Sequence, residues 1–207
     1  TSLFSSVLIA ALAIAGWTAP AYAAAAKAMP MFEVDKGWPQ KPANMKFGDV
    51  SSIAIDDKDN AWVLTRPRTL KPEDKAQAAP PVTIFDASGK YVRGWGGDGP
   101  GYQWPEREHG ILFDAKGNVW LGGNSCPENG LPGLRPVTDD QLLKFSRDGK
   151  FLLQVGKSSA SKGNADTANF HRPADAQYVP ATNELFVADG YGNHRVAVFD
   201  ADSGKFK

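Results

Sequence analysis

Few residues in this 207-residue sequence combine a reactive side chain with a position where a loop would present it. The clearest is Tyr191, which lies between two glycines in a loop otherwise made of small and polar residues, 189–194. A phenol on such a loop can donate or accept a hydrogen bond or give up its proton; alternatively, it packs at a rim. The histidines His109, His171 and His194, taken alone, suit a turn, a strand entrance and a repeat position respectively.

The single cysteine, Cys126, is next to Pro127 and has no second cysteine to pair with, which excludes an internal disulfide. No helix is expected next to it that would activate the thiol. We assign it no role.

The loop around Tyr191 joins two apolar runs, residues 184–188 and 195–199. Short apolar and aromatic runs separated by Gly, Asn and Asp predict a β-hairpin. The strands of this hairpin must position the tyrosine.

The same two-strand pattern occurs twice earlier in the chain, and each copy is followed by a second strand pair that turns at a Gly-Lys. Phe85, Phe145 and Phe199 mark one position of this repeat. The expected strand pairs are 52–56 with 61–64, 82–85 with 91–95, 110–114 with 119–121, 142–145 with 151–155, 176–179 with 184–187, and 196–199 with a strand starting at 206.

Four short antiparallel strands per repeat predict an all-β fold, a β-propeller of the blade type. A solenoid or a sandwich would not explain a four-strand unit repeated in step. Propellers close with roughly four to eight blades, whereas this chain holds three to four, including a leading strand at 31–34, and would need roughly two or three more. Extra length falls in three loops, 67–81, 124–139 and 157–169. We therefore expect both ends of the sequence to be truncated.

The N-terminus predicts export. Residues 7–15 are apolar, Ala21-Tyr22-Ala23 forms an A-x-A cleavage site, and residues 1–23 are interpreted as a signal peptide. The alternative is an uncleaved anchor, since residues 3–26 carry no charge. Residues 24–46 are a lead-in segment and 47–207 the propeller, in a periplasmic or secreted protein.

The charge balance limits the partners. Lys plus Arg and Asp plus Glu both number 23, so no overall charge attracts nucleic acid or acidic lipid. We expect no nucleic-acid partner, no membrane partner after signal cleavage, and a monomer when the chain is full length.

The third repeat resembles the NHL repeat, whose units commonly follow the pattern D-x-x-x-N-x-R-[VI]-x-x-F. Asp189, Asn193, Arg195, Val196 and Phe199 fit that pattern. The resemblance extends more weakly over roughly residues 47–206.

A narrower resemblance is to the peptidylglycine α-amidating lyase (peptidylamidoglycolate lyase) branch of six-bladed NHL propellers. That family has an arginine ten residues after a strand-ending aspartate, as Arg66 follows Asp56. It also has a His-Gly-aliphatic triplet, here residues 109–111, and an Asp-Gly-Tyr loop, here residues 189–191. The three positions occur in the right order and in the right repeats.

The resemblance implies a metal-dependent lyase that cleaves a peptidyl-α-hydroxyglycine into a peptide amide and glyoxylate. Arg66 and Tyr191 would be the catalytic pair, with the tyrosine as phenolate base, and His109 would be a zinc ligand. The backbone carbonyls of Ile53 and Ile111 would hold a structural calcium. The implied partner is a small-molecule or peptide substrate.

The sequence also departs from the family. One histidine cannot hold a catalytic zinc, and the family's other zinc ligands would lie beyond residue 207. Gly192 replaces a cysteine of eukaryotic members, and Thr65 replaces a polar aromatic residue. A non-catalytic propeller that binds a peptide, glycan or protein through its loops is the main alternative. A calcium-dependent sugar-lactone hydrolase is a weaker one, because no acidic metal cluster is evident.

Overall fold

The structure, a computed structural model, describes residues 29–127 and 133–207 in two units, Thr1–Asp35 and Lys36–Lys207. The predicted signal peptide, residues 1–23, lies outside the described residues. In the first unit, residues 29–35 form no strand, so the prediction of a strand at 31–34 is wrong. Met31 and Phe32 are 93% and 90% exposed. These residues pair with no neighbouring strand, and an extended segment becomes a strand only through such pairing.

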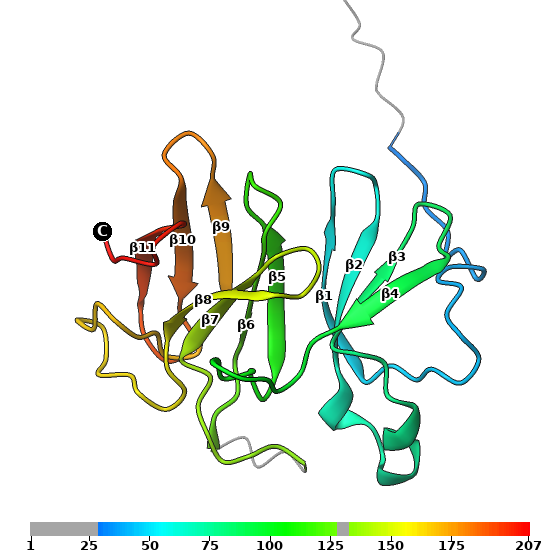
Figure 1. The fold of residues 1–207 in the computed structure, drawn as a ribbon, viewed down its shortest axis with the longest axis horizontal. Coiled ribbons are helices and arrows are strands. Elements are labelled where there is room, and N and C mark those ends of the chain that lie inside the picture. The colour runs from blue at the N-terminus through cyan, green and yellow to red at the C-terminus, as the bar shows by residue number, and fades with distance from the viewer. Residues whose placement is uncertain (1–28, 128–132) are drawn as a thin grey trace, which may run out of the picture. The chain divides into compact units, whose positions relative to one another are not determined.

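The described part of the second unit contains eleven strands in three antiparallel sheets (Figure 1). The strands are β1 (Asp49–Ile55), β2 (Ala61–Arg66), β3 (Val82–Phe85), β4 (Tyr91–Trp95), β5 (Glu108–Phe113), β6 (Val119–Gly123), β7 (Gln141–Phe145), β8 (Phe151–Gly156), β9 (Asp175–Val179), β10 (Glu184–Asp189) and β11 (Arg195–Asp200). Two short 3₁₀ helices, Pro67–Thr69 and Pro72–Gln77, occupy part of the loop predicted at 67–81.

The sheets confirm the predicted repeat. The first has the order β1-β2-β3-β4, the second β5-β6-β7-β8, and the third β11-β10-β9. Each sheet is a meander of neighbouring strands, as in a propeller blade. The third sheet has begun a fourth strand, since Phe206 forms an antiparallel bridge with Phe199. The chain is thus all-β, built from NHL-type propeller blades.

Two strands are longer at one end than the sequence pattern predicts. The pattern ends the second strand at residue 64, yet β2 continues to Arg66, which pairs with Asp49. The strand predicted to start at 110 begins at Glu108 in β5. Because of this, Arg66 and His109 both stand on strands rather than in loops.

Side-chain alternation along the central strands holds neighbouring sheets together. On β6, Val119 and Leu121 face the first sheet, while Trp120 between them faces the third. On β7, Leu143 likewise packs in the core between the first and middle sheets, and Leu142 packs in the core between the middle and third sheets. All five residues of β6 are buried because both faces of the middle sheet are covered.

The strand-pair turns use glycine as predicted. Gly89, Gly149 and Gly204 have φ angles of +85°, +81° and +68°. Glycine adopts this left-handed region without a steric penalty, and the turns can therefore reverse the chain between adjacent strands.

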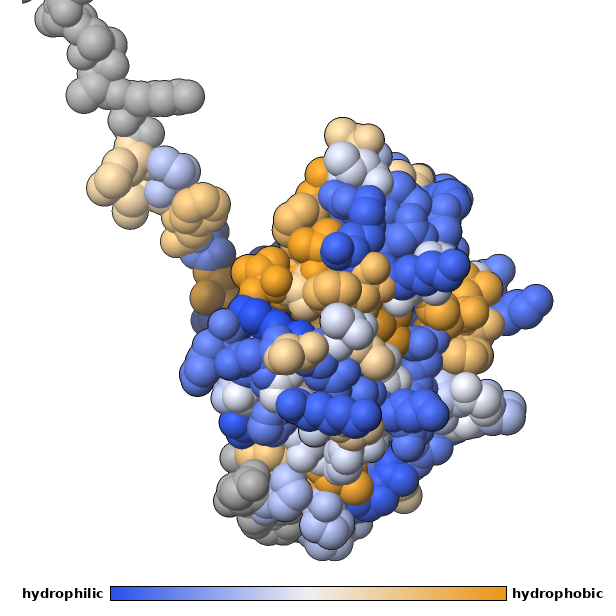
Figure 2. All heavy atoms as spheres, turned by 90° about the vertical axis from the view of Figure 1, so that its left-hand side faces the viewer, coloured by the Kyte–Doolittle hydropathy of each residue, from blue (hydrophilic) through white to orange (hydrophobic). Residues whose placement is uncertain are grey.

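Apolar side chains remain exposed along β11, where Val196 is 65% exposed, and at Phe206, which is 43% exposed. Figure 2 views the side on which β11 lies and shows apolar atoms between larger polar areas. No helix in the described residues has the length and apolarity to cross a membrane.

Candidate active site

Three side chains from three different sheets meet at one place. Arg66 is the last residue of β2, His109 lies near the start of β5, and Tyr191 lies in the loop between β10 and β11. Arg66 Nη2 lies 3.4 Å from His109 Nδ1, and Tyr191 Oη lies 3.3 Å from His109 Nε2. The ring centroids of His109 and Tyr191 are 5.5 Å apart. The imidazole therefore bridges the guanidinium and the phenol.

Backbone contacts hold Arg66 beside the imidazole. Its Nε donates a 2.7 Å hydrogen bond to the carbonyl oxygen of Glu108, the residue before His109. Its own carbonyl accepts a 2.8 Å bond from the Thr69 hydroxyl, which in turn accepts from the N–H of Asp49. The guanidinium is thus tied to β5, and the end of β2 is tied to the loop that follows it.

Hydrogen-bond chemistry fixes the direction of the contacts through His109. A guanidinium can only donate, so Nδ1 of His109 must accept from Arg66. Burial, followed by the charges of Arg66 and Arg107, lowers the pKa of His109 and favours the neutral ring. A neutral imidazole with an accepting Nδ1 carries its proton on Nε2. That proton points to Tyr191, whose oxygen is the acceptor.

The contact presents the phenol oxygen of Tyr191 as an acceptor, and its role as a base stays a prediction. Arg66 stays protonated, as guanidinium groups do in proteins, and one imidazole ring separates it from the phenol. Tyr191 is 50% exposed, so a substrate can reach its oxygen.

The buried carboxylate of Asp189 anchors the Tyr191 loop through hydrogen bonds. Asp189 accepts from the backbone N–H of His171 at 2.8 Å, from Asn193 Nδ2 at 2.8 Å and from Arg195 Nε at 2.9 Å. Arg195 also donates to backbone carbonyls of the loop before β9, among them Asn169. The Asp, Asn and Arg of the repeat pattern therefore form one network that fixes both ends of the loop.

Two further residues hold the loop from the side. Arg172 donates to the carbonyl of Tyr191 at 2.6 Å and to Cys126 Sγ at 3.0 Å. The N–H of Gly192 donates to the carbonyl of His171 at 2.9 Å, and the His171 ring lies only 2.4 Å from where a Cβ on Gly192 would be. Glycine at position 192 is therefore required by a close approach.

Glu108 is a buried acid beside the site. It is fully buried and accepts a 2.7 Å hydrogen bond from Trp104 Nε1, while its Oε2 has no partner in the described residues. Burial raises its pKa to about 7. Its carbonyl, rather than its side chain, contacts Arg66.

Arg107 is a second cation next to His109. Burial lowers the pKa values of Arg66 and His109, and the positive charge of Arg107 lowers both further. Among the described residues the side chain of Arg107 forms no ion pair, and its Nε is buried without an acceptor.

The two predicted calcium carbonyls lie at matching positions of neighbouring inner strands. Ile53 of β1 pairs with Val63, and Ile111 of β5 pairs with Leu121. The side chain of Ile53 is 53% exposed and that of Ile111 is buried. Calcium binding there stays a prediction.

The described residues do not build a complete zinc centre. No three His, Cys, Asp or Glu side chains among them gather closely enough to hold a metal ion. Both ring nitrogens of His109 are engaged with protein groups, so a metal would have to displace Tyr191 or Arg66 from one of them. Zinc binding by His109 stays a prediction that needs ligands from elsewhere.

Sequence reasoning missed Arg107, Glu108 and Arg172. The first two belong to a charged run directly before His109, which is the only sign of them. Arg172 contacts residues 19 and 46 positions away, and no local pattern reveals such contacts.

Comparison with known families agrees with the repeat. Residues 170–199 match the sequence model of the NHL repeat. This segment contains Asp189, Tyr191 and Arg195, and it ends at Phe199.

The chain is also similar to amidating monooxygenases. It is 28% identical over 183 residues to the peptidylglycine alpha-amidating monooxygenase of Rattus norvegicus, covering 77% of this chain and 16% of that protein. It is 26% identical over 182 residues to peptidyl-glycine alpha-amidating monooxygenase A of Xenopus laevis, covering 81% and 17%. The chain thus spans less than a fifth of these relatives.

Solved structures with a partial likeness include a virginiamycin B lyase from Staphylococcus aureus, with a TM-score of 0.43 and 15% identity over 76% of this chain and 40% of that one. A gluconolactonase from Xanthomonas campestris has a TM-score of 0.48 and 16% identity over 76% of this chain and 46% of that one.

Proposed function

We propose that this chain is part of a lyase that cleaves peptidyl-α-hydroxyglycine into a peptide amide and glyoxylate. The observation that carries the proposal is the bridge from Arg66 through His109 to Tyr191. Three sheets each contribute one of these residues. The similarity to peptidylglycine alpha-amidating monooxygenases adds support, since their name describes chemistry at a peptidyl glycine.

The reaction needs a base at the substrate's hydroxyl group. The oxygen of Tyr191 takes the hydroxyl proton, and the electron pair of that O–H bond forms the carbonyl of glyoxylate. The bond between the α-carbon and the amide nitrogen breaks, and the nitrogen leaves with the bonding pair and takes a proton to become the peptide amide. Arg66, acting through His109, stabilises the phenolate that begins this step.

Zinc and calcium are proposed cofactors only. A bound zinc would lower the pKa of the substrate hydroxyl. Since the described residues offer His109 alone, we assign no step to the metal. The metal content of the purified protein tests this part, and zinc would require further ligands from residues outside the described set.

The activity can be measured directly. The protein is incubated with an N-acylated dipeptide ending in α-hydroxyglycine, and peptide amide and glyoxylate are quantified together. We expect both products in equal amounts, faster than the spontaneous breakdown without protein. The same peptide ending in glycine is the control, because it has no hydroxyl to deprotonate.

Release no faster than the spontaneous rate would contradict the proposal. The alternative, a non-catalytic NHL propeller, then predicts peptide binding without turnover. We also propose a periplasmic or secreted location, which cell fractionation tests: protein retained only in the cytoplasm would contradict it.

A further inference from the structure

A pocket of about 470 Å³ lies between the loop that follows β2 and the segment that precedes β5. Its size is within the range of small-ligand sites. One wall is the loop after β2, with Arg68, Lys71 and Lys75, and another includes Arg107, the residue directly before β5. Among the described residues that line it, Asp49 is the single acidic one.

The pocket is continuous with the ends of the strands that carry the site. Asp49 pairs with Arg66 across β1 and β2, and the Thr69 hydroxyl, also at the pocket, donates to the Arg66 carbonyl. Arg107 is two residues before His109. The charge of Arg107 also acts on Arg66 and His109, so a ligand held by Arg107 would lie near these two residues.

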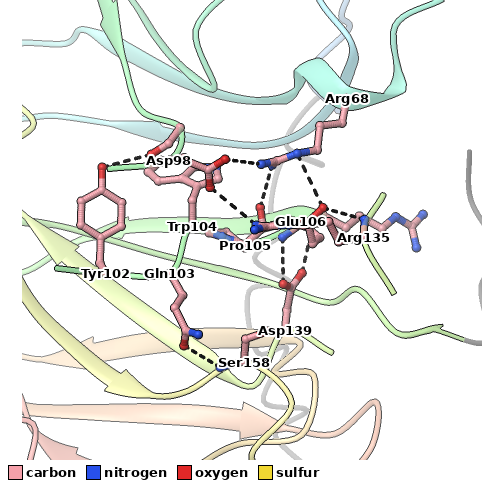
Figure 3. A network of polar contacts seen from close by, with 12 residues as sticks. Arg68, Asp98, Tyr102, Gln103, Trp104, Pro105, Glu106, Arg135, Asp139 and Ser158 are labelled. Carbon is pink, nitrogen blue, oxygen red and sulfur yellow. Dashed lines mark hydrogen bonds and ion pairs between the residues drawn. The ribbon is translucent and has the colours of Figure 1, made fainter. Parts of the chain in front are cut away.

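Only some of the lining cations are neutralised by the protein. Arg68 donates to Asp98 at 3.1 Å and lies 3.6 Å from the buried Glu106 (Figure 3). Lys71, Lys75 and Arg107, by contrast, form no ion pair with any residue in 29–127 or 133–207. Three positive charges thus face one carboxylate, and the pocket favours an anion.

A buried network fixes the backbone that carries Arg107. Asp139, fully buried, accepts a 2.8 Å hydrogen bond from the N–H of Glu106 (Figure 3). It also accepts a 3.0 Å hydrogen bond from the N–H of Arg107. Glu106 is in turn held by Arg135. The Arg107 main chain is therefore pre-positioned.

The guanidinium of Arg107 is suited to a carboxylate. Its Nε is buried without an acceptor in the described part of the chain, and its side chain forms no ion pair there. A guanidinium presents its N–H groups in a fork that matches two carboxylate oxygens, whereas the lysines act as point charges nearby.

We propose that this pocket binds an acidic side chain of the peptide substrate, with Arg107 as its main contact and Lys71 and Lys75 in support. The proposal rests on the proposed function for the identity of the substrate as a peptide. The pocket would give the enzyme a preference for peptides with an acidic side chain. In the proposed function Arg66, His109 and Tyr191 act on the α-hydroxyglycine end of the peptide and do not provide that preference.

The test uses matched tripeptides in which Glu is compared with Gln at each position before the terminal group. Affinity is measured by calorimetry with the peptide amides, so binding does not depend on turnover. Glyoxylate release is measured separately with the corresponding α-hydroxyglycine peptides. We expect about tenfold tighter binding of Glu over Gln at one position.

Variants locate the preference. Arg107→Gln is expected to reduce the Glu-to-Gln affinity ratio to near one. Lys75→Gln, at an exposed position, is expected to reduce it partly and keeps the test valid if Arg107→Gln does not fold. Lys58→Gln, an exposed lysine in the turn between β1 and β2, is the control and is expected to keep the full ratio.

The two proposals fail in different ways. Equal affinity for Glu and Gln peptides at every position, or a full ratio in both pocket variants, overturns the pocket proposal even if glyoxylate is released. A Glu preference lost in Arg107→Gln, without any glyoxylate release, supports the pocket and overturns the lyase.

Discussion

The proposed chemistry depends on the neutral imidazole of His109, because this ring contacts both the guanidinium of Arg66 and the phenol of Tyr191. Its two nitrogens have opposite roles, accepting from Arg66 and donating to Tyr191. This polarity follows from the guanidinium having only donors. It needs no assumption about the substrate.

At the same scale, Asp56 is expected to make folding stability sensitive to acid. Burial opposes its ionisation, but hydrogen bonds from Asn60, Trp62 and Lys58 outweigh this effect and lower its pKa to about 2. A carboxylate with a depressed pKa in the folded state stabilises the protein above its unfolded pKa, near 4. That stability is lost as the pH falls from about 4 through 2.

Asp56→Asn should therefore lower the free energy of unfolding by about 1–3 kcal/mol at pH 6 and by less at pH 3. Urea denaturation at the two pH values measures this. Asp59→Asn in the same turn is the control, since Asp59 has a left-handed φ of 59° that asparagine tolerates. An equal loss from Asp56→Asn at both pH values would contradict the assignment.

Individual residues were predictable from the sequence where their role is local or belongs to a repeat. Asp56 closes a turn, and Arg66, His109 and Tyr191 were found through the family resemblance, each in a different repeat. Arg107 and Arg172 could not be found this way, because their importance comes from where distant segments place them.

At the scale of elements, the hairpin of β10 and β11 determines where Tyr191 lies. The loop has little room on one side, where His171 packs against Gly192. On the other side Gly190 faces open space, because no described atom lies within 4 Å of the position that a Cβ would take there. The two glycines around the tyrosine therefore have different roles.

We predict that Gly192→Ala lowers glyoxylate release by about tenfold or more and stability by about 1–3 kcal/mol, because the new methyl group would displace either His171 or the loop. Gly190→Ala should change stability by no more than about 0.5 kcal/mol. Thermal melting and the glyoxylate assay measure both. If the two variants behaved alike, His171 would not be what holds the loop.

The strand order was predictable because turn residues and apolar alternation are repeated in each sheet. The ends of the strands were harder to predict. β2 and β5 extend beyond the sequence pattern through backbone hydrogen bonds, and every residue type other than proline can make these. The segment at 31–34 shows the reverse error: an apolar pattern without a partner strand stays exposed.

At the scale of the whole second unit, contacts between sheets hold the site together. Lys144 of β7 is buried and donates to Asp114 at 2.9 Å and to the carbonyl of Ala201 at 2.7 Å, and it lies over the Trp120 ring. Ala201 directly follows β11. A single buried cation thus joins the second sheet to the third.

Lys144→Met should lower the free energy of unfolding by about 3–5 kcal/mol, because it leaves a buried carboxylate without its cation. Lys116→Met is the matched control. It removes an exposed ion pair, Lys116 with Asp202, which solvent screens, so we expect a much smaller loss of stability. Urea denaturation distinguishes the two, and equal effects would show that Lys144 does not join the sheets.

The central claim is that Arg66 acts through His109 on Tyr191, and a double-mutant cycle on glyoxylate release tests it most directly. Tyr191→Phe removes the base and should slow release by about 10²–10⁴-fold. Arg66→Gln should also slow it, while the double variant should be no slower than Tyr191→Phe alone, since both changes remove the same step. Near-normal release by Tyr191→Phe, or losses that multiply in the double variant, would contradict the account.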